Sequence, residues 1–135
     1  MTDVGWQLLP HTADVRLAAW APSRQGLYEA LASGLFGALE GRGAPSPTFR
    51  WGVQLEREAE AELLVAWLNT LLYWHETSGA WPASISVAFP ARHGLLAAIT
   101  GGGGVTPGRE VKAATYHGLA LSLEPQWRAA VILDL

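Results

Sequence analysis

Two helix-like leucine patterns, set among segments that alternate like β-strands, constrain the fold of this chain most strongly. Leucines recur every four residues from Leu27 to Leu39, which places them on one face of a helix. Ser23 precedes this stripe as a good N-cap, although Gly26 cannot complete a capping box. A second helix follows the glutamates of residues 56–62, and its buried stripe comprises Leu64, Trp67, Leu68, Leu71 and Leu72. Gly79 lies just beyond the expected end of this helix. The chain therefore contains two helices that must each bury an apolar face.

The other apolar segments predict strands. Large apolar residues alternate with polar or small ones over residues 49–55 and 127–133. Further strands are expected at residues 6–9, 15–20, 85–89, 95–100, 111–116 and 119–123, with a flexible glycine tip at 101–104. The order is two strands, helix, strand, helix and then strands alone. It predicts an α+β fold in which two helices pack on one face of a largely antiparallel sheet.

Composition narrows the class of protein. The 135 residues favour one domain, residues 1–135, and an apolar content of 50% with 16% charged residues indicates a globular chain. The absence of cysteine excludes disulfides and thiolate metal sites. A net charge of −3 without any basic run argues against DNA or free-standing RNA binding as the main activity. The chain shows neither a signal peptide nor a membrane-spanning apolar run, so we expect a soluble cytoplasmic protein.

Lysine and aspartate are rare in this chain, and the residues of these two types lie in separate segments. Lys112 is the only lysine, and Asp14 and Asp134 are two of only three aspartates. We hypothesise that the two chain ends and the Lys112 segment meet and form a small charged site. Two carboxylates with the main chain of Leu135 and waters would suit a hard divalent cation such as Ca²⁺ or Mg²⁺.

Simpler interpretations of the same residues stay open. Asp14 is also typical of a turn residue that accepts backbone N–H groups, and Asp134 of a solvated terminal carboxylate. Lys112 could be an exposed strand charge beside Glu110. His117 fits either a hydrogen-bonding turn residue or a proton-handling group, and His11 is equally ambiguous. No two histidines have zinc-ligand spacing.

Four sequence blocks together resemble the archease family. They are His11–Asp14, Leu68–Tyr73, Glu110–His117 and the terminal Val131–Leu135. Each block alone is a weak signal, but the four occur in the family's order, and the resemblance extends over about residues 6–135. The segment after Asp14 and the glycine-rich loop from Gly101 depart from the usual family pattern.

The resemblance implies an accessory protein, not an enzyme, for the RtcB-type RNA ligase. That ligase joins RNA ends carrying a 3′-phosphate or cyclic phosphate to 5′-hydroxyl ends, using GTP and a divalent metal, in tRNA splicing and RNA repair. Archease promotes guanylylation of the ligase and its multiple turnover, so tRNA would be reached through the ligase.

The resemblance also assigns site residues. It implies a metal site, with calcium expected and magnesium or manganese as alternatives, at Asp14, Asp134 and the main chain of Leu135. Lys112 would belong to the same functional surface, together with His11, Glu110 and His117.

Two other functional classes compete with this hypothesis. One is a small metal-dependent phosphohydrolase, with Asp14 and Asp134 as ligands and His117 as acid or base. The sequence offers few further polar groups for such a site. The other is a chaperone-like adaptor that binds clients through exposed tryptophans.

Overall fold

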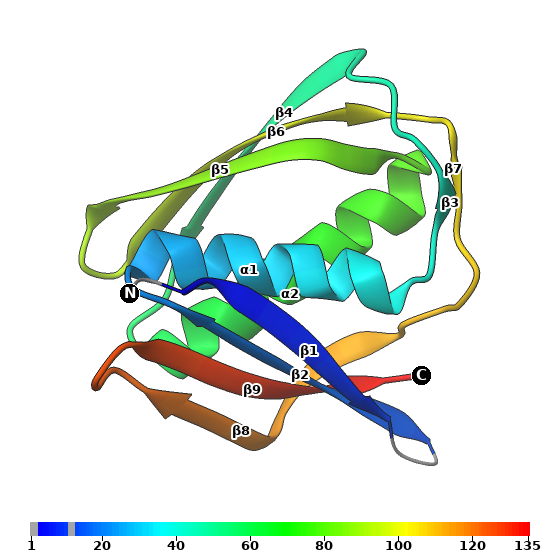
Figure 1. The fold of residues 1–135 in the computed structure, drawn as a ribbon. Coiled ribbons are helices and arrows are strands. Elements are labelled where there is room, and N and C mark those ends of the chain that lie inside the picture. The colour runs from blue at the N-terminus through cyan, green and yellow to red at the C-terminus, as the bar shows by residue number, and fades with distance from the viewer. Residues whose placement is uncertain (1–2, 11–12) are drawn as a thin grey trace.

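The computed structural model describes residues 3–10 and 13–135, which form two helices and nine strands (Figure 1). The helices are α1 (Arg24–Ala38) and α2 (Glu60–Ser78). The strands are β1 (Gly5–Pro10), β2 (Asp14–Ala21), β3 (Arg42–Gly43), β4 (Phe49–Glu56), β5 (Trp81–Ala91), β6 (Gly94–Gly102), β7 (Val105–Thr106), β8 (Ala113–Ser122) and β9 (Trp127–Asp134).

All strand pairings among the described residues are antiparallel. One sheet has the strand order β1-β2-β9-β8, a second has the order β4-β6-β5, and β3 and β7 form a two-residue pairing. Figure 1 shows α1 and α2 between the two larger sheets. The α+β class with a largely antiparallel sheet is confirmed. Both helices lie on one face of the four-stranded sheet, and the three-stranded sheet covers their other side.

This position between two sheets explains why α1 is buried well beyond its leucine stripe. Leu27, Leu31 and Leu35 are fully buried, and so are Tyr28 and Ala32. The helix packs against β1 and β2 on one side and against β5 on the other. One continuous core joins residues of both sheets and both helices.

Local signals set the helix ends. Ser23 caps α1 as expected, because its Oγ accepts a hydrogen bond from the Gly26 N–H at 3.0 Å. The second helix begins at Glu60, four residues later than the first glutamate, because Glu56 still belongs to β4. Gly79 ends α2 in the left-handed region, at φ 71°, where glycine is favoured. None of the described helices is long and apolar enough to span a membrane.

The strands after α2 differ from the sequence expectation. The two strands expected at residues 111–116 and 119–123 form the single strand β8. Its pairing with β9 is irregular between Thr115 and Ala120, and Gly118 has a φ of 72° there. The break in alternation therefore marks a bulge within one strand. The glycine segment at 101–104 is also partly strand, because β6 extends to Gly102.

Candidate functional site

The two rare aspartates face each other across neighbouring strands. Asp14 at the start of β2 pairs directly with Asp134 at the end of β9. The next pair, Val15 and Leu133, is buried in the core, so alternation places both carboxylates on the outer face of the sheet. Side chains opposite each other in this way have Cβ atoms about 5 Å apart. β2 and β9, the last strand of the described fold, thus present two acids at one point, half-buried at Asp14 and exposed at Asp134.

Lys112 lies beside this pair. Its main-chain N–H donates a hydrogen bond of 2.8 Å to the carbonyl oxygen of Asp134. Ala113, the next residue, is the β8 partner of Asp134 in the sheet. Val111 is buried and Lys112 is exposed, so the ammonium group faces solvent. The structure therefore brings together the three segments that carry Asp14, Lys112 and Asp134.

An asparagine on α2 holds the β8 segment in place. The Asn69 Oδ1 accepts a hydrogen bond from the Ala114 N–H at 2.8 Å, and its Nδ2 donates to the Ala114 carbonyl at 3.1 Å. One amide side chain thus substitutes for a neighbouring strand at the edge of β8. Sequence reasoning quoted Asn69 within a motif but gave it no role. The available signal was a polar residue inside an apolar helical stripe, between Leu68 and Leu71.

The other predicted site residues either lie farther from the aspartate pair or fall outside the residues that the structure describes. His117 is exposed, and its N–H donates to the Thr115 Oγ1 at 3.0 Å. It lies four residues along β8 from Ala113, which is about 13 Å at the usual strand rise. Glu110 is exposed and lines a cavity of about 610 Å³ with His75 and Arg109. His11 lies outside the described residues.

The donor chemistry of the aspartate pair suits a hard cation. Two carboxylates project from the same face, and the main chain at the end of β9 adds oxygens beside them. Within residues 3–10 and 13–135, no cluster of three or more His, Cys, Asp or Glu side chains could hold a metal ion. A cation at this point would therefore take its remaining ligands from main-chain carbonyls and water. The metal site stays a prediction.

Comparisons with known proteins show which family this chain resembles. Residues 6–135 match the family model described as the archease protein family (MTH1598/TM1083). The protein archease of Methanopyrus kandleri is 28% identical over 96% of this chain and 99% of its own length. The probable protein archease of Mycobacterium tuberculosis is 31% identical over 99% of this chain and 76% of its own length.

Solved structures support the same assignment. The solution structure of Methanobacterium thermoautotrophicum protein 1598 superposes with a TM-score of 0.71 at 26% identity, covering 97% of this chain and 99% of that one. An archease of Thermotoga maritima, described as a possible chaperone, has a TM-score of 0.61 at 20% identity and covers 94% of each chain, which shows the shared fold. With a family match over nearly its whole length, this chain belongs to the archease protein family.

Proposed function

We propose that this protein activates an RtcB-type RNA ligase by presenting the Asp14–Asp134 pair and Lys112 to the ligase active site. The observation that carries the proposal is the direct pairing of Asp14 with Asp134, together with the hydrogen bond from the Lys112 N–H to Asp134. Membership of the archease family supports the choice of partner. The protein itself would catalyse no reaction, and tRNA would be bound by the ligase.

The charges at this point match the needs of guanylylation. In that step a ligase side chain attacks the α-phosphate of GTP, and pyrophosphate leaves with its negative charge. Lys112 is an exposed ammonium on a flexible stem, which can approach a phosphate as a point charge. Preorganised positive charge near a developing anion lowers the barrier to phosphoryl transfer. The main-chain hydrogen bond to Asp134 fixes where the Lys112 stem begins.

The two carboxylates would hold the cation of this site. Calcium is the expected ion, with magnesium and manganese as alternatives, because all three prefer oxygen ligands. When bound, the cation would supply Lewis-acid charge for the triphosphate. Asp14 and Asp134 would position it, and the opposed strands would keep the two carboxylates at a set separation. Such a function would place the protein in the cytoplasm.

The test is a guanylylation assay of purified ligase with GTP and variants of this protein. We expect Asp14→Ala, Asp134→Ala and Lys112→Ala each to lose stimulation at least about tenfold, the effect of removing one strong charge contact of about 1.4 kcal/mol. Glu124→Gln, an exposed carboxylate on another part of the surface, is the matched control. Each variant is first checked for folding by circular dichroism. Full stimulation by all three folded variants would overturn the proposal.

Two other activities compete with this proposal, and further assays of the same proteins distinguish them. The Thermotoga maritima relative is described as a possible chaperone, so binding of unfolded proteins is the second candidate. Suppression of client aggregation without metal, unaffected by the three substitutions, would favour it. Turnover of phosphoesters by the isolated protein would instead favour a phosphohydrolase, for which the separation of His117 from the aspartate pair is a poor arrangement.

A further inference from the structure

The outer edge of β5 carries main-chain groups that no neighbouring strand pairs among the described residues. β5 ends the sheet order β4-β6-β5, and among the described residues no strand pairs with its other side. The Val87 N–H points to that outer side, because it donates to the Glu29 Oε2 at 3.0 Å. Main-chain groups of alternate residues point the same way in a strand, so the N–H and C=O of Ile85 face outward as well. Such an edge is a template for an added strand.

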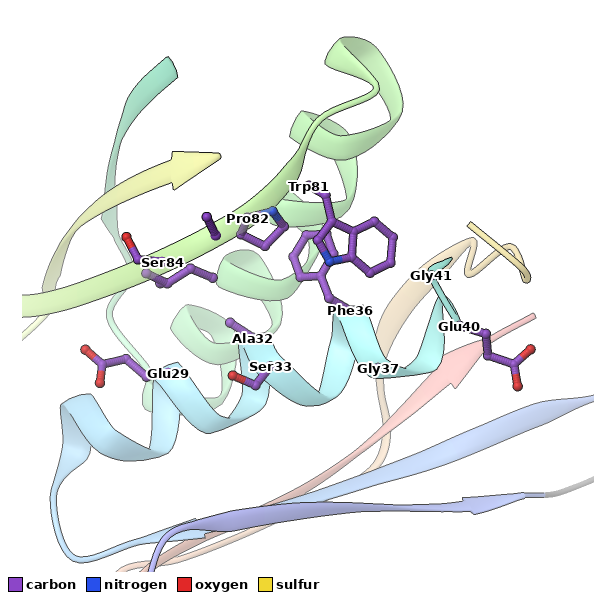
Figure 2. Close-up of a pocket in the computed structure, with 12 residues that line it drawn as sticks. Glu29, Ala32, Ser33, Phe36, Gly37, Glu40, Gly41, Trp81, Pro82 and Ser84 are labelled. Carbon is purple, nitrogen blue, oxygen red and sulfur yellow. The ribbon is translucent and has the colours of Figure 1, made fainter. Parts of the chain in front are cut away.

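A groove runs along this edge between β5 and α1. Its volume is about 440 Å³, and its lining includes the α1 residues Ala32, Ser33 and Gly37 opposite Pro82 and Ser84 of β5. Figure 2 shows Ala32 on the side of α1 that faces β5 and Pro82 across from it on β5, whereas the Ser84 side chain points away from α1, where its Oγ hydrogen-bonds to Thr100 of β6. Phe36 and Trp81 pack against each other toward the Glu40 end of the groove, with ring centroids 5.1 Å apart. The small residues leave room for an extended chain beside β5.

The charge of the groove is purely acidic. Glu29 and Glu40 lie toward its two ends, and no lysine or arginine is among the lining residues. The Glu29 carboxylate uses one oxygen for the Val87 N–H, and its second oxygen can accept from another donor. α1 rises about 14 Å from Glu29 to Ala38, and Glu40 lies two residues beyond the end of the helix. Four residues of an extended strand cover about 13 Å, so a long basic side chain would span the remaining distance to Glu40.

We propose that this groove binds an extended basic peptide segment of a partner protein, which adds a strand to β5 and places basic side chains four residues apart beside Glu29 and Glu40. Main-chain hydrogen bonds to Ile85 would supply affinity, and the two carboxylates would select the charge pattern. A second copy of this chain is a poorer occupant, because pairing two β5 edges would bring the acidic grooves of both copies together. The surface belongs to the three-stranded sheet, so the inference is independent of the proposed function.

The test uses short fluorescent peptides and the full chain, followed by anisotropy at low salt. A Lys-Val-Thr-Val-Lys peptide, with lysines four residues apart, should bind saturably, and a tenfold increase in salt should weaken binding. Three comparison peptides should bind at least fivefold more weakly. They are a peptide of the same composition with adjacent lysines, a Glu-Val-Thr-Val-Glu peptide, and a peptide with an N-methylated main chain. Equal binding of the adjacent-lysine or acidic peptide would overturn the charge pattern. Equal binding of the N-methylated peptide would overturn strand addition.

Matched substitutions locate the binding. Glu29→Gln keeps an acceptor for the Val87 N–H, and with Glu40→Gln it should weaken the peptide about two- to fivefold per site. Glu58→Gln, an exposed carboxylate outside the groove, should leave binding unchanged. In heteronuclear NMR spectra the Ile85 amide should shift on titration. Any of three results would overturn the proposal: an unshifted Ile85 amide, an equal loss of peptide binding with Glu58→Gln, or dimerisation of the chain through β5.

Discussion

At the scale of single residues, strand alternation decides what each charged group can do. Asp14 and Asp134 pair on the outer face, while Val15 and Leu133 pair in the core. A shift of β2 by one residue against β9 would turn the Asp14 carboxylate into the core, where an unpaired charge is very costly. The large cost of that alternative fixes the register of β2 against β9, and with it the approach of the two acids. The same apolar pattern that builds the core therefore also builds the candidate site.

Calcium should stabilise the folded chain through the aspartate pair. A ligand that binds only the native state adds stability that grows with its concentration, about 2.7 kcal/mol at one hundred times its dissociation constant. We expect a higher Tm in calcium than in chelator for the original chain. Asp14→Asn and Asp134→Asn should each abolish the difference.

Differential scanning calorimetry with both additives measures this effect. Glu124→Gln is the control and should keep the calcium response. An unchanged calcium response in both asparagine variants would exclude a cation held by these carboxylates. Without calcium, Asp134→Asn should unfold at a Tm equal to or slightly above that of the original chain, because like charges directly opposite each other are destabilising.

Lys112 should contribute to folding through its main chain and to function through its side chain. The side chain is exposed, so Lys112→Ala should change the free energy of unfolding by less than about 0.5 kcal/mol. Lys112→Pro removes the N–H that bonds to the Asp134 carbonyl and should cost about 1–3 kcal/mol. Urea unfolding of both variants checks the prediction. Equal loss of stability in the two would show that the ammonium group, and not the main chain, holds this segment.

At the scale of elements, local chemistry predicted the helix starts and helix ends that depend on a single residue. Ser23 and Gly79 could be assigned from sequence because a hydroxyl cap and a left-handed glycine act on their own helix. The continuity of β8 could not, because alternation breaks at its bulge and a bulge resembles a turn in sequence. The support of β8 by Asn69 also escaped prediction, since that contact joins residues 45 positions apart.

Replacement of Asn69 should destabilise β8 more than its partial exposure suggests. Asn69→Ala leaves both main-chain groups of Ala114 without their partner, which should cost about 1–3 kcal/mol in the free energy of unfolding. Hydrogen exchange at the Ala114 amide should accelerate with it. Tyr73→Ala, which truncates an exposed side chain on the same helix, is the matched control. A similar stability loss in the two variants would contradict the bracing role of Asn69.

At the scale of the whole molecule, the sequence predicted both helices, most of the strands and the fold class, but not the division into two sheets. Alternation shows which face of each strand is buried, yet it does not show which strands are neighbours. A signal for the second sheet was present in α1, where Tyr28 and Phe36 lie off the leucine stripe and are nevertheless buried.

Hydrogen bonds between α1 and α2 fasten the two helices to each other within the layer between the sheets. The Tyr28 hydroxyl donates to the Glu60 carboxylate at 2.6 Å, and Arg24 donates to the same carboxylate at 2.9 and 3.1 Å. Burial, reinforced by this carboxylate, raises the pKa of Tyr28 above its ordinary value, so the hydroxyl keeps its proton at physiological pH. Each helix thus holds the other between the sheets.

Because one core spans both sheets, they should unfold together. Ile99 on β6 and Leu17 on β2 are both fully buried, one in each sheet, and truncation of either to alanine should cost about 2–5 kcal/mol. In each variant the whole chain should still unfold in one transition, with coincident curves from far-UV circular dichroism and tryptophan fluorescence. Leu96→Ala, which truncates a 43% exposed leucine on β6, should shift the curves far less than Ile99→Ala. If Ile99→Ala melted one sheet before the other, the helices would be carrying two separate cores instead of one. The coincidence of the curves therefore tests whether the strands that present Asp14 and Asp134 derive their rigidity from the entire molecule.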